Sequence, residues 1–137
     1  MTNERLHEVL VDCQYIPGEY LVSTLKIRRV EYFEKGEKIP YILYVIHIGG
    51  LEVVGGVLDM GVRDFHMFTI PEYRGRGYMT ASLPVILKDI VDRHYDPKEK
   101  KENKQLSCSI KRENKNALWV VTTGVRMTDI KFTIRIE

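Results

Sequence analysis

A run of alternating arginine and glycine residues stands between an apolar segment and a helix-forming one. In PEYRGRGYMTASL (71–83), this run extends from Arg74 to Gly77. Glycines such as Gly75 can adopt positive φ and allow a ligand to approach the backbone closely. The first N–H groups of a following helix have no partner within the helix and attract anions. The spacing therefore fits an anion-binding turn, or a tight turn whose arginines are merely solvated.

The composition is that of an ordinary globular protein. The 137 residues are 44% hydrophobic and 29% charged, which predicts one domain, 1–137, with its own core. A net charge of +2 is too small to indicate a nucleic-acid partner. No apolar run reaches the roughly 20 residues that span a bilayer, and the N-terminus lacks a signal-peptide core. We therefore expect no membrane partner. Cys13 and Cys108 are far apart in the sequence and do not form a metal-ligand pair, so we expect reduced thiols, no metal site and a cytoplasmic protein.

Hydrophobic periodicity predicts an α+β fold. Because the second half alternates strand, helix and strand, its strands should run parallel, whereas the earlier strands look antiparallel, so the central sheet should be mixed. The predicted elements are a first helix through Cys13 that Pro17-Gly18 ends, strands at 19–33, 41–48, 51–60 and 64–70, a helix at 77–94, a strand at 106–110, a helix at 114–123 that Gly124 ends, and one or two strands after it.

Three features interrupt these patterns. Gly55-Gly56, within the 51–60 strand, predicts a bulge or a close approach of another backbone. Pro84 lacks an N–H group, so the 77–94 helix should kink there or begin near Ser82. The charged segment 96–105 reads as a surface loop rather than a nucleic-acid patch, because acidic residues interrupt its lysines.

Two segments resemble the GNAT superfamily of N-acetyltransferases. FTIPEYRGRGYMTASL (68–83) is similar to that family's coenzyme A-binding segment, in which a strand leads through Arg/Gln-x-x-Gly-x-Gly/Ala into a helix. Arg74 and Gly77 occupy the first two signature positions, and Met79 stands where glycine or alanine is usual. SIKRENKNALWVV (109–121) resembles the family's strand and asparagine-led helix. The order of elements agrees over roughly residues 40 to 126.

The resemblance implies a GNAT-like mixed central sheet flanked by helices and splayed between its fourth and fifth strands. It also implies acetyl-CoA or coenzyme A as co-substrate, with the pyrophosphate at the arginine–glycine turn and the pantetheine arm paired to the fourth strand. Asn114 matches the asparagine that often contacts pantetheine, and Ala117 the small residue one turn later. The implied cofactor-binding residues are Met67, Phe68, Thr69, Arg74, Gly75, Arg76, Gly77, Tyr78, Met79, Thr80, Asn114 and Ala117.

The catalytic positions depart from the family pattern. Ser109 stands where some relatives have a glutamate base, and Val121 where the tyrosine acid usually sits. Histidine titrates near neutral pH, so His66 could replace the base, or it could be an outward-facing histidine. His66 and Ser109 are therefore the candidate catalytic residues. Three further residues could also take part: Asp64 as a base acting through water, Tyr78 as the acid and Cys108 as an acyl carrier. Each also has a structural interpretation, as a surface carboxylate, a packing ring and a buried inert thiol, respectively. Trp119 is expected in the core.

The sequence thus leaves three functions open. The first is an N-acyltransferase that moves an acetyl group from acetyl-CoA to a primary amine of a small molecule or protein. The second is a GNAT-fold protein that binds coenzyme A or a protein partner without efficient catalysis, which the residues at 79, 109 and 121 favour. The third, nucleic-acid binding through the basic turn, is disfavoured by the near-neutral charge. The amine acceptor is unspecified, and so is the oligomeric state, with a homodimer as one option.

Overall fold

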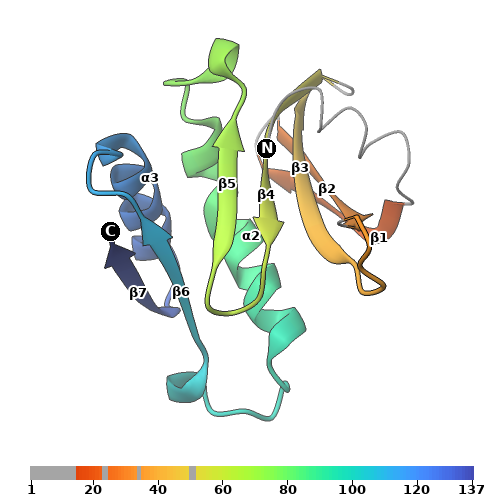
Figure 1. Ribbon diagram of the computed structural model, residues 1–137, viewed down its shortest axis with the longest axis vertical. Helices are drawn as coiled ribbons and strands as arrows, with labels where there is room; N and C mark the ends of the chain where they lie inside the picture. The colour runs from red at the N-terminus through yellow and green to blue at the C-terminus, as the bar shows by residue number, and fades with distance from the viewer. Residues whose placement is uncertain (1–14, 23–24, 34, 50–51) are drawn as a thin grey trace.

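The fold is α+β. A computed structural model describes residues 15–22, 25–33, 35–49 and 52–137 (Figure 1). Its elements are β1 (Tyr15–Val22), β2 (Leu25–Tyr32), β3 (Tyr41–Ile48), β4 (Glu52–Asp59), β5 (Phe65–Thr69), the 3-10 turn η1 (Pro71–Tyr73), α2 (Tyr78–His94), η2 (Lys101–Asn103), β6 (Gln105–Ile110), α3 (Lys115–Arg126) and β7 (Lys131–Ile136).

The strands form two sheets rather than the single mixed sheet that the sequence predicted. Strands β1 to β5 make an antiparallel sheet in sequence order, while β6 pairs in parallel with β7. In Figure 1, β5 and β6 point the same way but lie apart, with α2 and α3 behind them. The Ser107 N–H donates to the carbonyl oxygen of Val62, 2.9 Å away, which joins β6 to the loop before β5. Strand β6 is thus joined to the chain just before β5, but the two strands belong to different sheets and form no ladder with each other.

The first half of the chain corrects two predictions. The predicted strand at 19–33 is two strands, β1 and β2, whose pairing runs to Val22 opposite Leu25. Pro17-Gly18 lies inside β1 and does not end a helix. The register of β1 against β2 is irregular between Tyr15 and Glu19, and β1 lies at the edge of the sheet as described; edge strands and irregular positions are where proline is tolerated. The predicted first helix lies outside the described residues.

The glycine pair of β4 confirms the close approach expected there, and an irregularity of register lies directly beside it. The register between β3 and β4 shifts between Ile46 and His47. A Cβ atom on Gly55 would lie 2.5 Å from the carbonyl oxygen of Phe68, and one on Gly56 would lie 2.8 Å from that of Tyr44. Neither position has room for a side chain. Gly55 therefore allows β5, and Gly56 allows β3, to lie tightly against β4.

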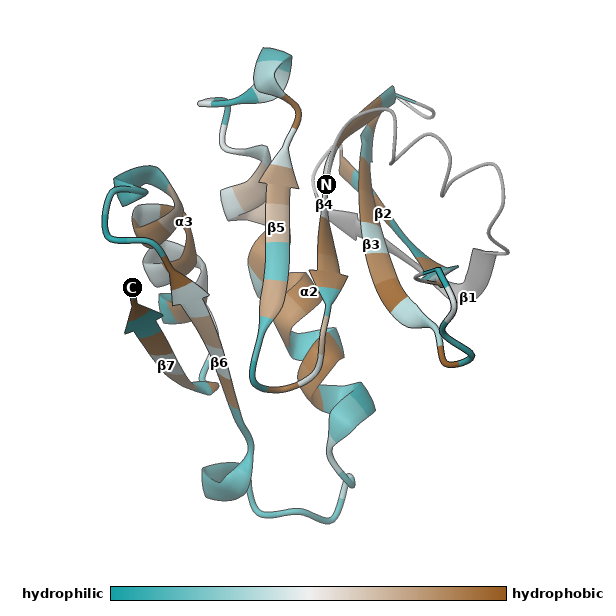
Figure 2. Cartoon of the chain, in the orientation of Figure 1, coloured by the Kyte–Doolittle hydropathy of each residue, from teal (hydrophilic) through white to brown (hydrophobic). Residues whose placement is uncertain are grey.

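Helix α2 supplies most of the core that covers the sheet. Leu83, Ile86, Leu87 and Ile90 are each at most 1% exposed and pack toward the strands. Figure 2 shows the matching apolar stretches of β3, β4 and α2. The helix begins at Tyr78 and includes Pro84, which agrees with the helix predicted at 77–94 and excludes the alternative start near Ser82.

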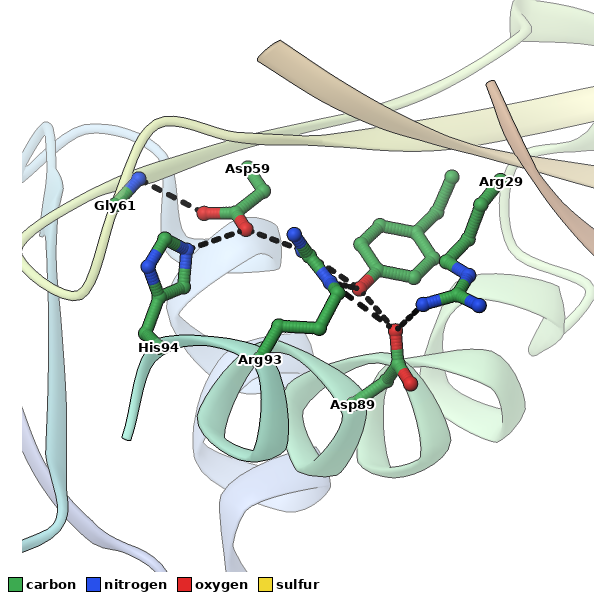
Figure 3. A network of polar contacts seen from close by, with 7 residues as sticks. Arg29, Asp59, Gly61, Asp89, Arg93 and His94 are labelled. Atoms are coloured by element: carbon green, nitrogen blue, oxygen red, sulfur yellow. Dashed lines mark hydrogen bonds and ion pairs between the residues drawn. The ribbon is translucent and has the colours of Figure 1, made fainter. Parts of the chain in front are cut away.

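A buried polar network fastens the second half of α2 to the sheet (Figure 3). The Tyr44 hydroxyl donates to Asp89 Oδ2 and accepts from Arg93 Nη2 at 2.8 Å. The Arg93 guanidinium also pairs with Asp59, whose Oδ2 lies 2.7 Å from His94 Nε2. Because Asp59 is 2% exposed, these partners are what make its burial tolerable.

The network favours the neutral phenol and the charged guanidinium. Burial and the hydrogen bond to Asp89 raise the pKa of Tyr44 far above its usual value. Burial alone would lower the pKa of Arg93, but Tyr44 and Asp59 raise it above the ordinary value. Arg29 adds an ion pair to Asp89 at 3.3 Å. The second half of α2 is thereby held to β2, β3 and β4.

Helix α3 begins where its asparagine predicts and continues past its predicted end. Asn114 is the N-cap, and its Oδ1 accepts a hydrogen bond from the Ala117 N–H at 3.0 Å. Gly124 does not end the helix, which runs on to Arg126. A Cβ atom at Gly124 would lie 3.0 Å from Leu83 Cδ2, so this glycine serves the close contact with α2. Neither α2 nor α3 is long and apolar enough to cross a membrane.

Candidate functional site

A cavity of about 750 Å³ opens where β5, the turn before α2 and the helix α3 meet. Its volume is within the range of small-molecule sites. The cavity is lined by Met67, Phe68 and Thr69 of β5, by Tyr73, Arg74, Gly75, Gly77, Tyr78, Met79, Thr80 and Ala81 around the start of α2, and by Asn114, Asn116, Ala117, Trp119, Val120 and Met127 of the α3 region.

The structure gathers almost all of the sequence-predicted cofactor residues around this cavity. They come from β5, from the glycine turn and from α3, which are up to 50 positions apart in the chain. Arg76 is the exception. Its guanidinium lies over the ring of Tyr73, 5.5 Å from the centroid, and does not line the cavity.

The glycine turn has the backbone geometry expected of it. Gly75 and Gly77 have φ of 78° and 79°, in the left-handed region that side chains disfavour. Apart from each glycine's own neighbours in the chain, no atom of the described residues lies within 4 Å of where its Cβ atom would be, so the turn borders open space. Gly77 is the N-cap of α2, and among the residues that the structure describes no side chain caps that end. The first N–H groups of α2 are consequently placed as an anion site would need them.

Two side chains shape this wall of the cavity. Arg74 Nε donates to the carbonyl oxygen of Thr69 at 3.1 Å, so its guanidinium is held between β5 and the turn. Met79 is only 6% exposed and packs in the core. Its core packing explains how the chain accepts methionine at a position where the resemblance expects glycine or alanine.

The opposite wall begins at Asn114. Capping uses only Oδ1 of this side chain, so it does not commit the two N–H donors of the amide. Ala117, one turn later, lines the cavity with a small side chain. The wall therefore offers hydrogen-bond donors beside an unobstructed surface.

The two candidate catalytic residues do not line the cavity. His66 is exposed and stands opposite Leu58 in the β4–β5 ladder. Side chains alternate across a strand, so His66 lies on the other face from Phe65 and Met67, which pack in the cluster with α2. The interpretation of His66 as an outward-facing histidine agrees with this position.

Ser109 is bound into a polar contact between β6 and β7. Its Oγ accepts from Arg135 Nε at 3.0 Å. Arg135 also donates to Ser107 Oγ at 2.8 Å and to the carbonyl oxygen of Arg63 at 2.7 Å. The arginine thus fastens both strands of the small sheet to the loop before β5, a structural role for Ser109.

Of the other residues considered for a catalytic role, most also lie outside the cavity. Cys108 is 2% exposed, and burial raises its pKa to about 11, so the inert-thiol interpretation fits. Val121 is 1% exposed in the core. Asp64 accepts a hydrogen bond from the Phe65 N–H and is not part of the cavity. Among these candidates, only Tyr78 lines it.

Sequence reasoning missed several lining residues and misplaced Trp119. Trp119 was expected in the core, but it is 61% exposed and lines the cavity. The missed signal is helical spacing: Asn116, Val120 and Met127 share a face once α3 is extended past Gly124. The lining residues not predicted are Tyr73, Ala81, Asn116, Trp119, Val120 and Met127.

The lining defines what the cavity can do chemically. Its titratable side chains are Arg74 and the tyrosines Tyr73 and Tyr78, whose ring centroids lie 6.3 Å apart. Within the part of the chain that the structure describes, no carboxylate, histidine or cysteine lines the cavity, and no group of three such residues could hold a metal ion. A cationic turn beside apolar walls suits an extended anion with apolar segments.

Comparison with known proteins adds no family to this description. No protein-family model matches the chain, and no curated protein or solved structure matches it either.

Proposed function

We propose that the chain is a GNAT-like, acyl-CoA-dependent N-acyltransferase that acts on a primary amine. The observation that carries the proposal is the cavity, which joins the glycine turn at the start of α2, the Met67–Thr69 stretch of β5 and the cap of α3. A coenzyme A pyrophosphate is a compact dianion. The positive φ and open space at Gly75 and Gly77 fit it, as does the uncapped end of α2.

The separation of the two sheets supports the same ligand. β5 pairs with β4 on one side only, and β6 pairs with β7 instead. An extended ligand with amide groups can add to such a free strand edge through main-chain hydrogen bonds. The pantetheine arm has this chemistry, and the cavity leads along Met67 to Thr69. If the family arrangement holds, its splay would correspond to the separation of β5 from β6.

The lining residues supply positioning more than proton transfer. Bound acyl-CoA would bring an activated thioester, and the walls would orient it toward an amine. Tyr78 lines the cavity and would be the side chain that donates a proton to the departing thiolate. Because the described lining contains no strong base, the acceptor amine should react as its free base, and the rate should rise with pH.

A second function is favoured by the same lining. A protein that holds coenzyme A without transferring the acyl group needs the turn and the strand edge but no base. The positions of His66 and Ser109 outside the cavity favour this alternative. Turnover with a panel of amines distinguishes the two functions.

Mass spectrometry of the native protein with acetyl-CoA, followed by calorimetric titration, tests the proposal. Gly77→Glu should abolish binding because it adds a negative charge where the pyrophosphate would lie. Gly77→Gln is the matched control, since it imposes the same strain at positive φ without the charge. We expect Gln to retain part of the affinity. A folded Gly77→Glu variant that binds acetyl-CoA like the wild type would overturn the proposed site.

A further inference from the structure

The indole of Trp119 is exposed at the rim of the cavity. It is 61% exposed, although tryptophan is normally largely buried. No aromatic ring or guanidinium among the described residues stacks on it. Because Trp119 also lines the cavity, its flat indole face is available for a planar ligand group to stack on.

The neighbours of Trp119 narrow the kind of group that would bind there. Asn116 precedes it by three positions on α3, so the two residues are adjacent on the helix surface, and both line the cavity. The Asn116 amide can both donate and accept hydrogen bonds, as the edge of a nucleobase requires. A polar amide next to a flat indole suits a heteroaromatic ring better than an aliphatic chain.

The opposite wall supplies the complementary charge. Arg74 and the uncapped start of α2 line the same cavity and favour an anion. A molecule that fits both walls has phosphate groups and a planar base joined by a short spacer. A nucleotide moiety has this composition.

We infer that Trp119 stacks on the adenine ring of coenzyme A and that Asn116 lies at the edge of that ring. The inference rests on the proposed function, because it takes coenzyme A as the ligand. In this arrangement, Trp119 binds the nucleotide half of the cofactor, the glycine turn holds the pyrophosphate, and β5 pairs with the pantetheine arm. Stacking of a base on an aromatic side chain strengthens binding by roughly tenfold or more.

The experiment compares fragments of the cofactor. The chain contains one tryptophan, so its intrinsic fluorescence reports on Trp119 alone. Coenzyme A and adenosine 3′,5′-bisphosphate should quench this fluorescence, whereas 4′-phosphopantetheine, which lacks adenosine, should bind without strong quenching. Trp119→Ala should raise the Kd for coenzyme A about tenfold and leave the Kd for 4′-phosphopantetheine unchanged. Trp119→Phe keeps an aromatic ring and should therefore retain most of the wild-type affinity for coenzyme A.

Phe33→Ala is the control, because Phe33 is also an exposed aromatic residue, at 46%, but does not line the cavity. It should leave both Kd values unchanged. Equal losses for coenzyme A and 4′-phosphopantetheine in Trp119→Ala would overturn stacking on adenine. If that variant binds coenzyme A like the wild type, and Gly77→Glu still abolishes binding, the inference fails and the proposed function stands. If the wild type binds no coenzyme A, both fail.

Discussion

The side chain of Arg74 donates from Nε to the carbonyl oxygen of Thr69, 3.1 Å away, and so ties the glycine turn to the end of β5. The next arginine, Arg76, instead lies over the ring of Tyr73. Two arginines with the same charge and nearly the same sequence position thus differ in their relation to the cavity. The difference makes them a matched pair for testing the turn.

Arg74→Ala should weaken acyl-CoA binding by about tenfold, because it removes a charge from the lining and a tie that holds the turn. Arg76→Ala should reduce the affinity for acyl-CoA clearly less, because Arg76 does not line the cavity. Calorimetric titration at low and high salt measures both, and the Arg74 loss should shrink at high salt through screening. Equal losses for the two variants would contradict the assignment of Arg74 alone to the cavity.

His66→Ala should leave the rate of acyl transfer within about twofold of wild type, because His66 does not line the cavity. The pH–rate profile should climb with the free amine and keep its shape in the variant. Ser109→Ala should also retain activity, with a stability loss of about 1 kcal/mol for the hydrogen bond from Arg135. Steady-state rates across pH 6 to pH 9 provide the check, and an inflection that disappears in His66→Ala would reinstate this histidine as the base.

Asp59→Asn should destabilise the fold by about 3 kcal/mol, since it removes the buried partner of Arg93 and His94. Urea denaturation measures the change. Asp129→Asn is the control: the Lys101–Asp129 pair is exposed on both sides, and its loss should not shift the midpoint measurably. Since the network lies in the second half of α2, Asp59→Asn that remains folded should bind acyl-CoA normally. A loss of binding without a loss of stability would be evidence against this separation.

Cys108 should make the fold sensitive to alkaline pH. Burial raises its pKa to about 11 in the folded chain, above an ordinary value of 9.0. Between these values the unfolded chain loses the proton while the folded chain keeps it, so stability should fall by about 2 kcal/mol as pH rises from 9 to 11. Cys108→Ala should flatten this part of the profile in chemical denaturation, even if it is less stable at pH 7. An unchanged slope would contradict a buried, protonated thiol.

The local features of the site followed from the sequence because they depend on backbone chemistry. Glycine alone tolerates the φ of positions 75 and 77, and asparagine at 114 is a preferred N-cap, so the turn and the start of α3 could be predicted from residue type. The long α2 likewise followed from its apolar period, and the Gly55-Gly56 pair from its missing side chains. The single strand predicted at 19–33 failed because β-branched residues continue through β1 into β2.

Only the tertiary structure decided which face each side chain takes. His66 and Met67 are neighbours in the chain, but the pleat of β5 places one away from α2 and the other against it. Gly124 looked like a helix end until the packing against Leu83 showed why a glycine stands there. Trp119 is of a residue type usually found in cores, and it lies exposed because α3 turns other residues, Val121 and Gly124, into the interior, with Gly124 against Leu83 of α2. Such outcomes depend on contacts between segments distant in the chain, which local propensity and spacing do not encode.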